Sequence, residues 1–344
     1  MSTPTAMERP PGQEVATRPE SPVVPNLWQR LRTWDEFGVV LALIVVMIGA
    51  TLSNRNFLRP DNLAGILQNV TFLGFIAIGL SFALLAGEID ISVGSIYGLT
   101  SVVTALVFRQ TEVLLLAIFA GLGVGIACGL VNGVVATVLR VPAVIITLAT
   151  LGVYRGFALV LAKGASVSGL PQDEFFFNIF GNGEAFQYIS WLTLLFLGVA
   201  VLAGLIVART AFGFQVYAVG SNALAARLVG FDVRRIRISV LTISGFTAGI
   251  AGVCSVAYLT SATPTGGTGY ELEALAAVII GGIKLTGGRG SILGTVIGLL
   301  VVGIIRNMLV LASVSTNWQQ AVTGAVLAAA VAVDQLANRR VVEA

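Results

Sequence analysis

The chain has 344 residues, of which 56% are hydrophobic and 11% are charged, and its mean hydropathy is +0.92. Because an ordinary soluble domain carries roughly 25% charged residues, this composition excludes a soluble globular protein and indicates an integral membrane protein. The net charge of +3 lies in short arginine-rich stretches between apolar runs, which is what membrane topology requires, so it does not indicate a nucleic-acid-binding protein.

The chain contains no histidine, and its two cysteines, Cys128 and Cys254, lie within apolar segments. A Ser-His-Asp or Cys-His nucleophile and a His-ligated zinc site are therefore excluded. We expect the cysteines to be packing residues, and neither a disulfide nor a metal site is predicted.

The N-terminal residues 1–36 hold six of the ten prolines and show no apolar periodicity, which predicts a disordered tail. A transmembrane domain is predicted over residues 37–336, followed by a short tail over residues 337–344. Its apolar segments lie at residues 37–52, 63–86, 91–108, 113–139, 141–162, 190–208, 237–260, 271–286, 291–312 and 317–336. The segments at 91–108 and 271–286 are short or interrupted by glycine, which is typical of broken or re-entrant helices. The sequence predicts an all-α fold with about ten transmembrane helices.

The charges on the loops predict the orientation of these helices. The loop at residues 209–237 carries five arginines against the single acid Asp232, which indicates the cytoplasmic side. The loop at residues 163–189 carries three acids against Lys163, together with Phe175, Phe176 and Phe177, and is expected to be external with an interfacial aromatic patch. Ten spans place both termini in the cytoplasm, although Arg55 and Arg59 in the first external loop oppose this assignment.

Two glycine-rich turns suggest an internal repeat. Residues 87–98 read GEIDIS-VGSIYG, and residues 281–294 read GGIKLT-GGRGSILG. Each turn lies between two apolar segments, so we expect two pseudo-repeated lobes with a substrate path near the interrupted segments. The alternative is a chance similarity between two tight turns.

Several polar side chains lie within or between apolar segments. A carboxylate at the bilayer centre costs on the order of 2.5–3.5 kcal/mol, so Glu88 and Asp90 are expected to line a path or gate for a hydroxylated solute. Alternatively, Asp90 or Ser92 caps the next helix. Asn69 and Asn132 are expected either to join helices or to bind solute, and Tyr97 either packs or stacks on a sugar ring. The predicted substrate pathway comprises Glu88, Asp90, Ser92, Asn69, Asn132 and Tyr97.

The arginine-rich loop contains a second candidate site. The segment ALAARLVG can form a short helix that is capped by Ser221 or Asn222 and ends at Gly230. Such a helix either docks a partner protein or lies on anionic lipid. The chain contains no G-x-x-x-x-G-K-[ST] motif, so any work driven by ATP must come from another subunit.

These segments resemble the membrane permeases of the ribose-type carbohydrate ABC importers. The motifs are GEIDISVGS (87–95), NGVVATVLRVPAVIITLATLGVYRG (132–156), YAVGSNALAARLVGFDVRRIRISV (217–240), SGFTAGIAG (244–252) and LAAVIIGGIKLTGGRGSILGTVIG (275–298). The resemblance covers residues 40–335. One position departs from the family, which commonly has glycine in place of Glu88.

The resemblance implies a fold like that of type II ABC importers, in the bacterial inner membrane, and transport of a monosaccharide or related polyol. It implies a second permease copy or a similar permease, a periplasmic solute-binding protein, and two ABC ATPases that hold ATP and Mg while this chain holds no cofactor. It further implies that residues 218–235 form a coupling helix that docks on the ATPase. The coupling residues are then Gly220, Asn222, Ala225, Ala226, Arg227 and Gly230.

Two other functions are compatible with the residues alone. A secondary transporter would use Glu88 or Asp90 as a proton or cation site. A membrane enzyme is disfavoured because the chain shows no recognisable nucleophile or metal cluster.

Overall fold

The computed structural model describes residues 36–171 and 174–315, together with 318, 321–322, 324–325, 327–329 and 332. The predicted tails at residues 1–36 and 337–344 lie outside the described residues, apart from Glu36, and so does most of the predicted span at residues 317–336.

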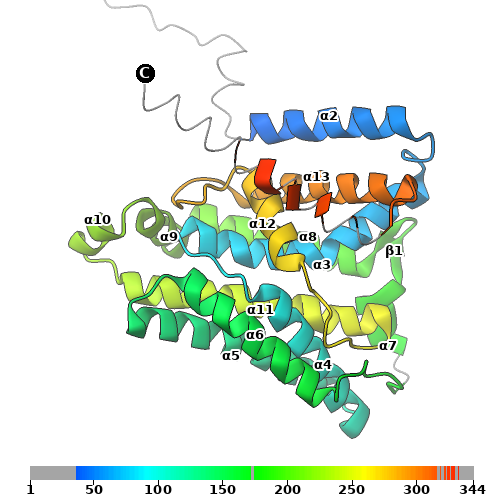
Figure 1. The fold of residues 1–344 in the computed structure, drawn as a ribbon, viewed down its shortest axis with the longest axis horizontal. Coiled ribbons are helices and arrows are strands. Elements are labelled where there is room, and N and C mark those ends of the chain that lie inside the picture. The colour runs from blue at the N-terminus through cyan, green and yellow to red at the C-terminus, as the bar shows by residue number, and fades with distance from the viewer. Residues whose placement is uncertain are drawn as a thin grey trace, which may run out of the picture. The chain divides into compact units, whose positions relative to one another are not determined.

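The described helices include one for each predicted apolar segment from 37–52 to 291–312, in the same order, and shorter helices in the loops at 163–189 and 209–237 (Figure 1). They are α2 (Phe37–Ser53), α3 (Pro60–Leu85), α4 (Val93–Thr111), α5 (Leu114–Leu139), α6 (Ala143–Leu161), α7 (Glu174–Phe177), η1 (Asn178–Asn182), α8 (Trp191–Arg209), α9 (Ala211–Ser221), α10 (Ala223–Leu228), α11 (Val233–Leu259), α12 (Tyr270–Ile280) and α13 (Ile292–Leu311). A two-stranded antiparallel sheet pairs β1 (Glu184–Phe186) with β2 (Ile189–Ser190).

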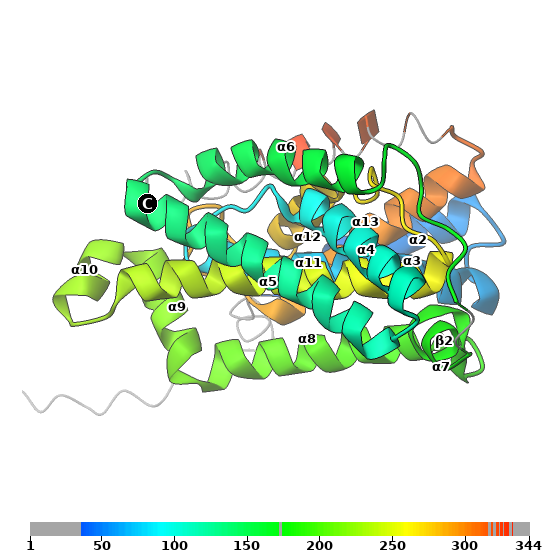
Figure 2. The ribbon, with the colours of Figure 1, turned by 90° about the horizontal axis from the view of Figure 1, so that it is seen from below.

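Close packing of α5 against α11 forms the centre of the bundle, where the two helices cross (Figure 2). Helix α5 carries glycines at four-residue intervals, at Gly121, Gly125, Gly129 and Gly133. A Cβ atom on Gly125 would lie 2.6 Å from the carbonyl oxygen of Gly245. Small residues at such spacing let two helix backbones approach closely, which is the main way that helices associate in lipid.

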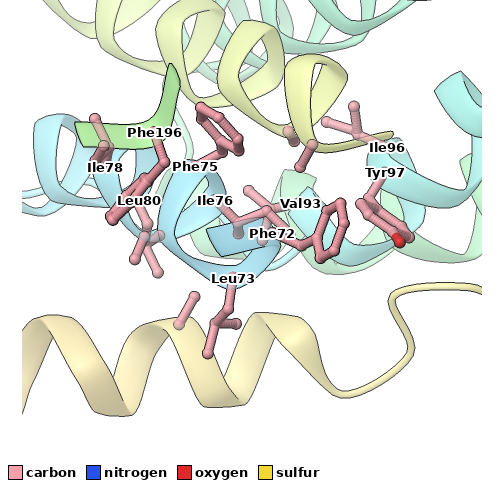
Figure 3. Packing of buried hydrophobic residues seen from close by; sticks show 14 of the residues in the cluster. Phe72, Leu73, Phe75, Ile76, Ile78, Leu80, Val93, Ile96, Tyr97 and Phe196 are labelled. Atoms are coloured by element: carbon pink, nitrogen blue, oxygen red, sulfur yellow. The ribbon is translucent and has the colours of Figure 1, made fainter. Parts of the chain in front are cut away.

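Helices α3 and α4 are enclosed by other helices. Every residue of α3 from Val70 to Leu85 is buried, and Figure 3 shows this packing around Phe72, Phe75 and Ile76, with Ile96 and Tyr97 of α4 alongside. Helix α4 also buries hydroxyl side chains, and three of them, Thr100, Ser101 and Thr104, donate to carbonyl groups of their own helix. These bonds satisfy the hydroxyls without a second helix.

Within the part of the chain that the structure describes, six helices are long and apolar enough to span a membrane: α3, α5, α6, α8, α11 and α13. Helix α2 is apolar but only 17 residues long. Helices α5, α6 and α8 expose many large apolar side chains, which suits contact with lipid. The chain is therefore an all-α, multi-pass membrane protein.

The apolar segment at residues 271–286, for which a short or glycine-interrupted helix was predicted, forms a helix only from Tyr270 to Ile280. Gly282, at φ = +90°, begins a turn that only glycine adopts readily. In the loop at 163–189, the expected aromatic patch is divided: Phe175 is 65% exposed, whereas Phe176 is fully buried and packs edge-on against Phe108.

Candidate functional site

The two glycine turns meet at one place, and α9 joins them there. The amide of Gly288 donates to the carbonyl oxygen of Leu85 at 2.9 Å. Gly220, in the last turn of α9, packs so tightly that a Cβ atom would clash with the same Leu85 oxygen and lie 2.7 Å from the Gly288 nitrogen. Gly87, Gly287 and Gly288 have φ values of +78°, +84° and +74°, which other residues adopt only with strain. Helix α9 is therefore in close contact with both turns.

Helix α10 is the short helix expected in the arginine-rich loop, and it follows directly after α9 (Figures 1 and 2). Asn222 caps it, since its Oδ1 accepts from the Ala225 amide at 2.9 Å. Ala226 is buried and anchors the helix, whereas Leu224 and Leu228 are 68% and 80% exposed. Gly230, at φ = +94°, follows the helix, and a Cβ atom at this position would meet nothing within 4 Å. Ala225 and Arg227 are exposed as well, so α10 presents a mixed apolar and basic face outside the bundle.

Glu88 lies in the connection between α3 and α4 and forms an ion pair with Arg237 of α11. The distance from Oε1 to the Arg237 Nε is 2.7 Å, and the contact lacks the alignment of a hydrogen bond. Glu88 is almost fully buried, while the Arg237 side chain is 43% exposed. The pair joins the first glycine turn to the beginning of α11.

Asp90, Ser92 and Asn132 form a buried polar network. Asp90 Oδ1 accepts from the Ser92 amide at 2.9 Å and from the Ser92 hydroxyl at 2.6 Å. Asn132 of α5 donates from Nδ2 to the Ser92 hydroxyl at 2.8 Å. Its Oδ1 accepts from Thr150 and Tyr154 of α6, both at 2.9 Å. Ser92 is the N-cap residue of α4, but its side chain makes no capping bond, so Asp90 orders the turn before the helix while Asn132 connects three helices.

Asn69 and Tyr97, the remaining predicted pathway residues, line a separate cavity of about 420 Å³. Its polar lining also includes Tyr258, Tyr270, Glu273, Arg306, Asn307 and Ser255. Glu273 of α12 and Arg306 of α13 form an ion pair at 3.0 Å. The six predicted pathway residues thus divide between the cavity, the buried network and the Glu88–Arg237 pair.

Glu273, Arg306 and the Asn132 partner Thr150 were not predicted from the sequence. Arg306 is a lone charge in an apolar segment, and Glu273 lies with Glu271 at the start of another, which is the kind of signal that drew attention to Glu88 and Asp90. Asn307 exchanges two hydrogen bonds with Asn62 of α3, at 2.8 and 3.1 Å, and therefore joins two helices. Among the described residues, no three histidine, cysteine, aspartate or glutamate side chains gather as metal ligands would.

Comparisons with known proteins identify relatives over most of the chain. Residues 62–331 match the family described as branched-chain amino acid transport system / permease component. The ribose import permease protein RbsC of Bacillus subtilis (strain 168) is 37% identical over 301 residues, which cover 88% of this chain and 93% of the relative. RbsC of Escherichia coli (strain K12) is 38% identical over 304 residues, covering 87% and 93%.

A third relative is the L-arabinose transport system permease protein AraH of Escherichia coli (strain K12). It is 36% identical over 304 residues, which cover 88% of this chain and 92% of the relative. No solved structure matches the chain.

Proposed function

Because the chain belongs to the family of branched-chain amino acid transport system permease components, we propose that it is the permease subunit of an ABC importer for a monosaccharide or related polyol. As a family member it is a transport subunit of the bacterial inner membrane and not an enzyme, and it works with ATPase and solute-binding partners. The relatives named for ribose and L-arabinose support the sugar class. They give no support to the alternative of a secondary transporter that uses Glu88 or Asp90.

The observation that carries the proposed coupling of ATP hydrolysis to transport is the contact of Gly220 with Leu85 and Gly288. Helix α10 exposes Leu224 and Leu228, and we propose that an ATPase, which holds ATP and Mg, grips this face together with Arg227. Movement of α10 would pass through α9 to both glycine turns, because the packing at Gly220 leaves no room for slippage. ATP-driven closure of the ATPases would then rock the helices that these turns connect.

The solute path is proposed to include the 420 Å³ cavity. The amide, phenol and charged groups that line it can form hydrogen bonds with the hydroxyl groups of a sugar, which both donate and accept. Its volume lies within the roughly 300–1,000 Å³ of small-molecule sites. Aromatic faces such as Tyr97 and Tyr258 can pack against the C–H face of a sugar ring. The network around Asp90 has its Oδ1 and the Asn132 oxygen already engaged, so we assign it the role of holding α4, α5 and α6 together.

The same proposal includes the extent of the membrane domain, its number of spans and its orientation in the membrane. The permease domain extends over residues 37–336 with about ten spans, the loop at 209–237 and both termini lie in the cytoplasm, and the turns at 87–98 and 281–294 belong to two related lobes. A second copy of the chain, or a similar permease, completes the assembly. A periplasmic binding protein delivers the solute.

Uptake by the purified assembly tests the proposal. The tagged chain is purified from its native membrane with the subunits that accompany it and is reconstituted in vesicles with radiolabelled ribose, L-arabinose or leucine. The expected result is sugar uptake that requires ATP and persists with an uncoupler. Uptake that stops with the uncoupler and persists without ATP would indicate a secondary transporter, and leucine uptake alone would refute the sugar assignment.

One substitution tests the path within the same assay. Glu273→Gln should lower sugar uptake at least tenfold, because hydrogen bonds to charged groups contribute about 1.5–3 kcal/mol. Glu184→Gln is the matched control, because Glu184 lies exposed in β1, outside the cavity. Equal uptake by the two variants would remove Glu273 from the path.

A further inference from the structure

A pocket of about 330 Å³ lies where α5 ends and α11 begins, beside α10. Its polar lining consists of Thr137 and Arg140 from α5 and its end, Arg227 from α10, and Arg234 and Arg237 from α11. Ala136 and Val233 complete the wall. None of these residues belongs to the cavity assigned to the solute.

The pocket concentrates positive charge. Four guanidinium groups line it, and none of the described residues that line it is acidic. Glu88 offsets one of the four through its ion pair with Arg237. Asp232 is occupied with Arg235, to which it is paired at 2.9 Å. Like charges that line one pocket repel each other, so the fold holds an excess of cations that an anion would stabilise.

A hydroxyl group in the pocket also lacks a partner in the described part of the chain. The buried hydroxyl of Thr137 has no hydrogen-bond partner among the described residues. A phosphate oxygen would satisfy it.

The surroundings of the pocket indicate that the phosphate belongs to a lipid. Val138 and Leu139, the residues just before Arg140, are 71% and 61% exposed, and Ile145 on α6 is 56% exposed. Exposed apolar side chains beside a cluster of arginines match both parts of an anionic phospholipid, and basic pockets between membrane helices bind such headgroups. We propose that this pocket binds the phosphate headgroup of an anionic phospholipid, whose acyl chains lie along α5 and α6.

Native mass spectrometry of the full chain, purified with its accompanying subunits in neutral detergent, tests this site. Phosphatidylglycerol and phosphatidylcholine with the same acyl chains are titrated separately. The wild type should retain phosphatidylglycerol in clear preference to phosphatidylcholine. Arg140→Gln combined with Arg234→Gln should weaken phosphatidylglycerol binding roughly tenfold or more, because each basic residue near a headgroup adds to the attraction.

The matched control combines Arg209→Gln with Arg289→Gln, which removes the same charge from outside the pocket. Both side chains are exposed, and neither lines the pocket. This control should bind lipid as the wild type does. If the double pocket variant fails to fold, single Arg234→Gln and Arg209→Gln variants give the same comparison with one exposed charge each.

Four results would overturn the proposal. These are equal binding of the two lipids, equal weakening in the control, and saturable binding of inorganic phosphate by a protein that retains no phosphatidylglycerol. The fourth is unchanged lipid binding with loss of an accompanying subunit from the pocket variant, which would make the pocket a protein contact.

Discussion

Replacing Gly220 by alanine places a methyl group at the contact between α9 and the two glycine turns. The added carbon would clash with the Leu85 carbonyl oxygen and lie 2.7 Å from the Gly288 nitrogen. These two atoms are already joined by the 2.9 Å hydrogen bond between the turns. Backbone atoms surround the new group, so no flexible side chain can move aside to admit it.

The expected cost follows from these two effects. Overpacking of this kind costs about 1–3 kcal/mol, and loss of the Gly288–Leu85 hydrogen bond costs about 0.5–1.5 kcal/mol. Part of the strain can be relieved by a shift of α9 away from the turns, which would displace α10 as well. We therefore expect Gly220→Ala to lower both the stability of the chain and the coupling of ATP hydrolysis to uptake.

The assay compares thermal unfolding midpoints of the purified protein and sugar uptake per ATP hydrolysed in vesicles. Gly220→Ala should lower the midpoint by several degrees and uptake per ATP at least fivefold. The control is Gly198→Ala in α8, where a Cβ atom meets nothing within 4 Å and alanine favours the helix by about 1 kcal/mol. If the two variants behave alike in both measurements, the contact at Gly220 does not transmit movement.

Three further substitutions test other contacts. Asn132→Leu should lower the thermal midpoint by the equivalent of about 2–4 kcal/mol, because it removes three hydrogen bonds between helices, each of which contributes about 0.5–1.5 kcal/mol; an unchanged midpoint would contradict the network. Glu88→Gln should destabilise the chain by about 1–3 kcal/mol, since its half-exposed partner Arg237 is left in a partly buried site. Adding Arg237→Gln should recover part of that loss in a double-mutant cycle, and strictly additive effects would deny the coupling. Gly125→Leu should abolish the folded, monodisperse peak in size-exclusion chromatography, whereas Gly152→Leu on α6, with open space around it, should keep that peak.

The helices and the ends of α10 could be predicted from the sequence because their signals are local. Long apolar runs give the spans. The sequence offered Ser221 or Asn222 as the cap of α10 and Gly230 as its end, and Asn222 is the residue that caps the helix. Helix α12 ends before the apolar run does. The residues after Ile280 are still largely apolar, but Gly282 adopts a positive φ that an α-helix does not allow.

The relations between distant residues could not be predicted in the same way. Glu273 and Arg306 are 33 positions apart on different helices, and nothing local pairs them. Asn132 was recognised as a buried amide, but its partners depend on how α5 crosses α4 and α6. The contact of Gly220 with Leu85 likewise requires the tertiary fold, since only the backbone approach makes that glycine necessary.

Helix α4 has a consequence for how the chain is synthesised. It is not among the described helices apolar enough to span a membrane by composition, it buries several hydroxyl side chains, and it packs against α5, α6 and α11. Residues of α11 leave the ribosome more than a hundred positions after α4. Until then α4 lacks its full protein surroundings and has little affinity for lipid. Its stable insertion must therefore be completed late in synthesis. In a chain truncated before α11, a cysteine introduced into α4 should be accessible to water-soluble thiol reagents, because α4 itself contains no cysteine.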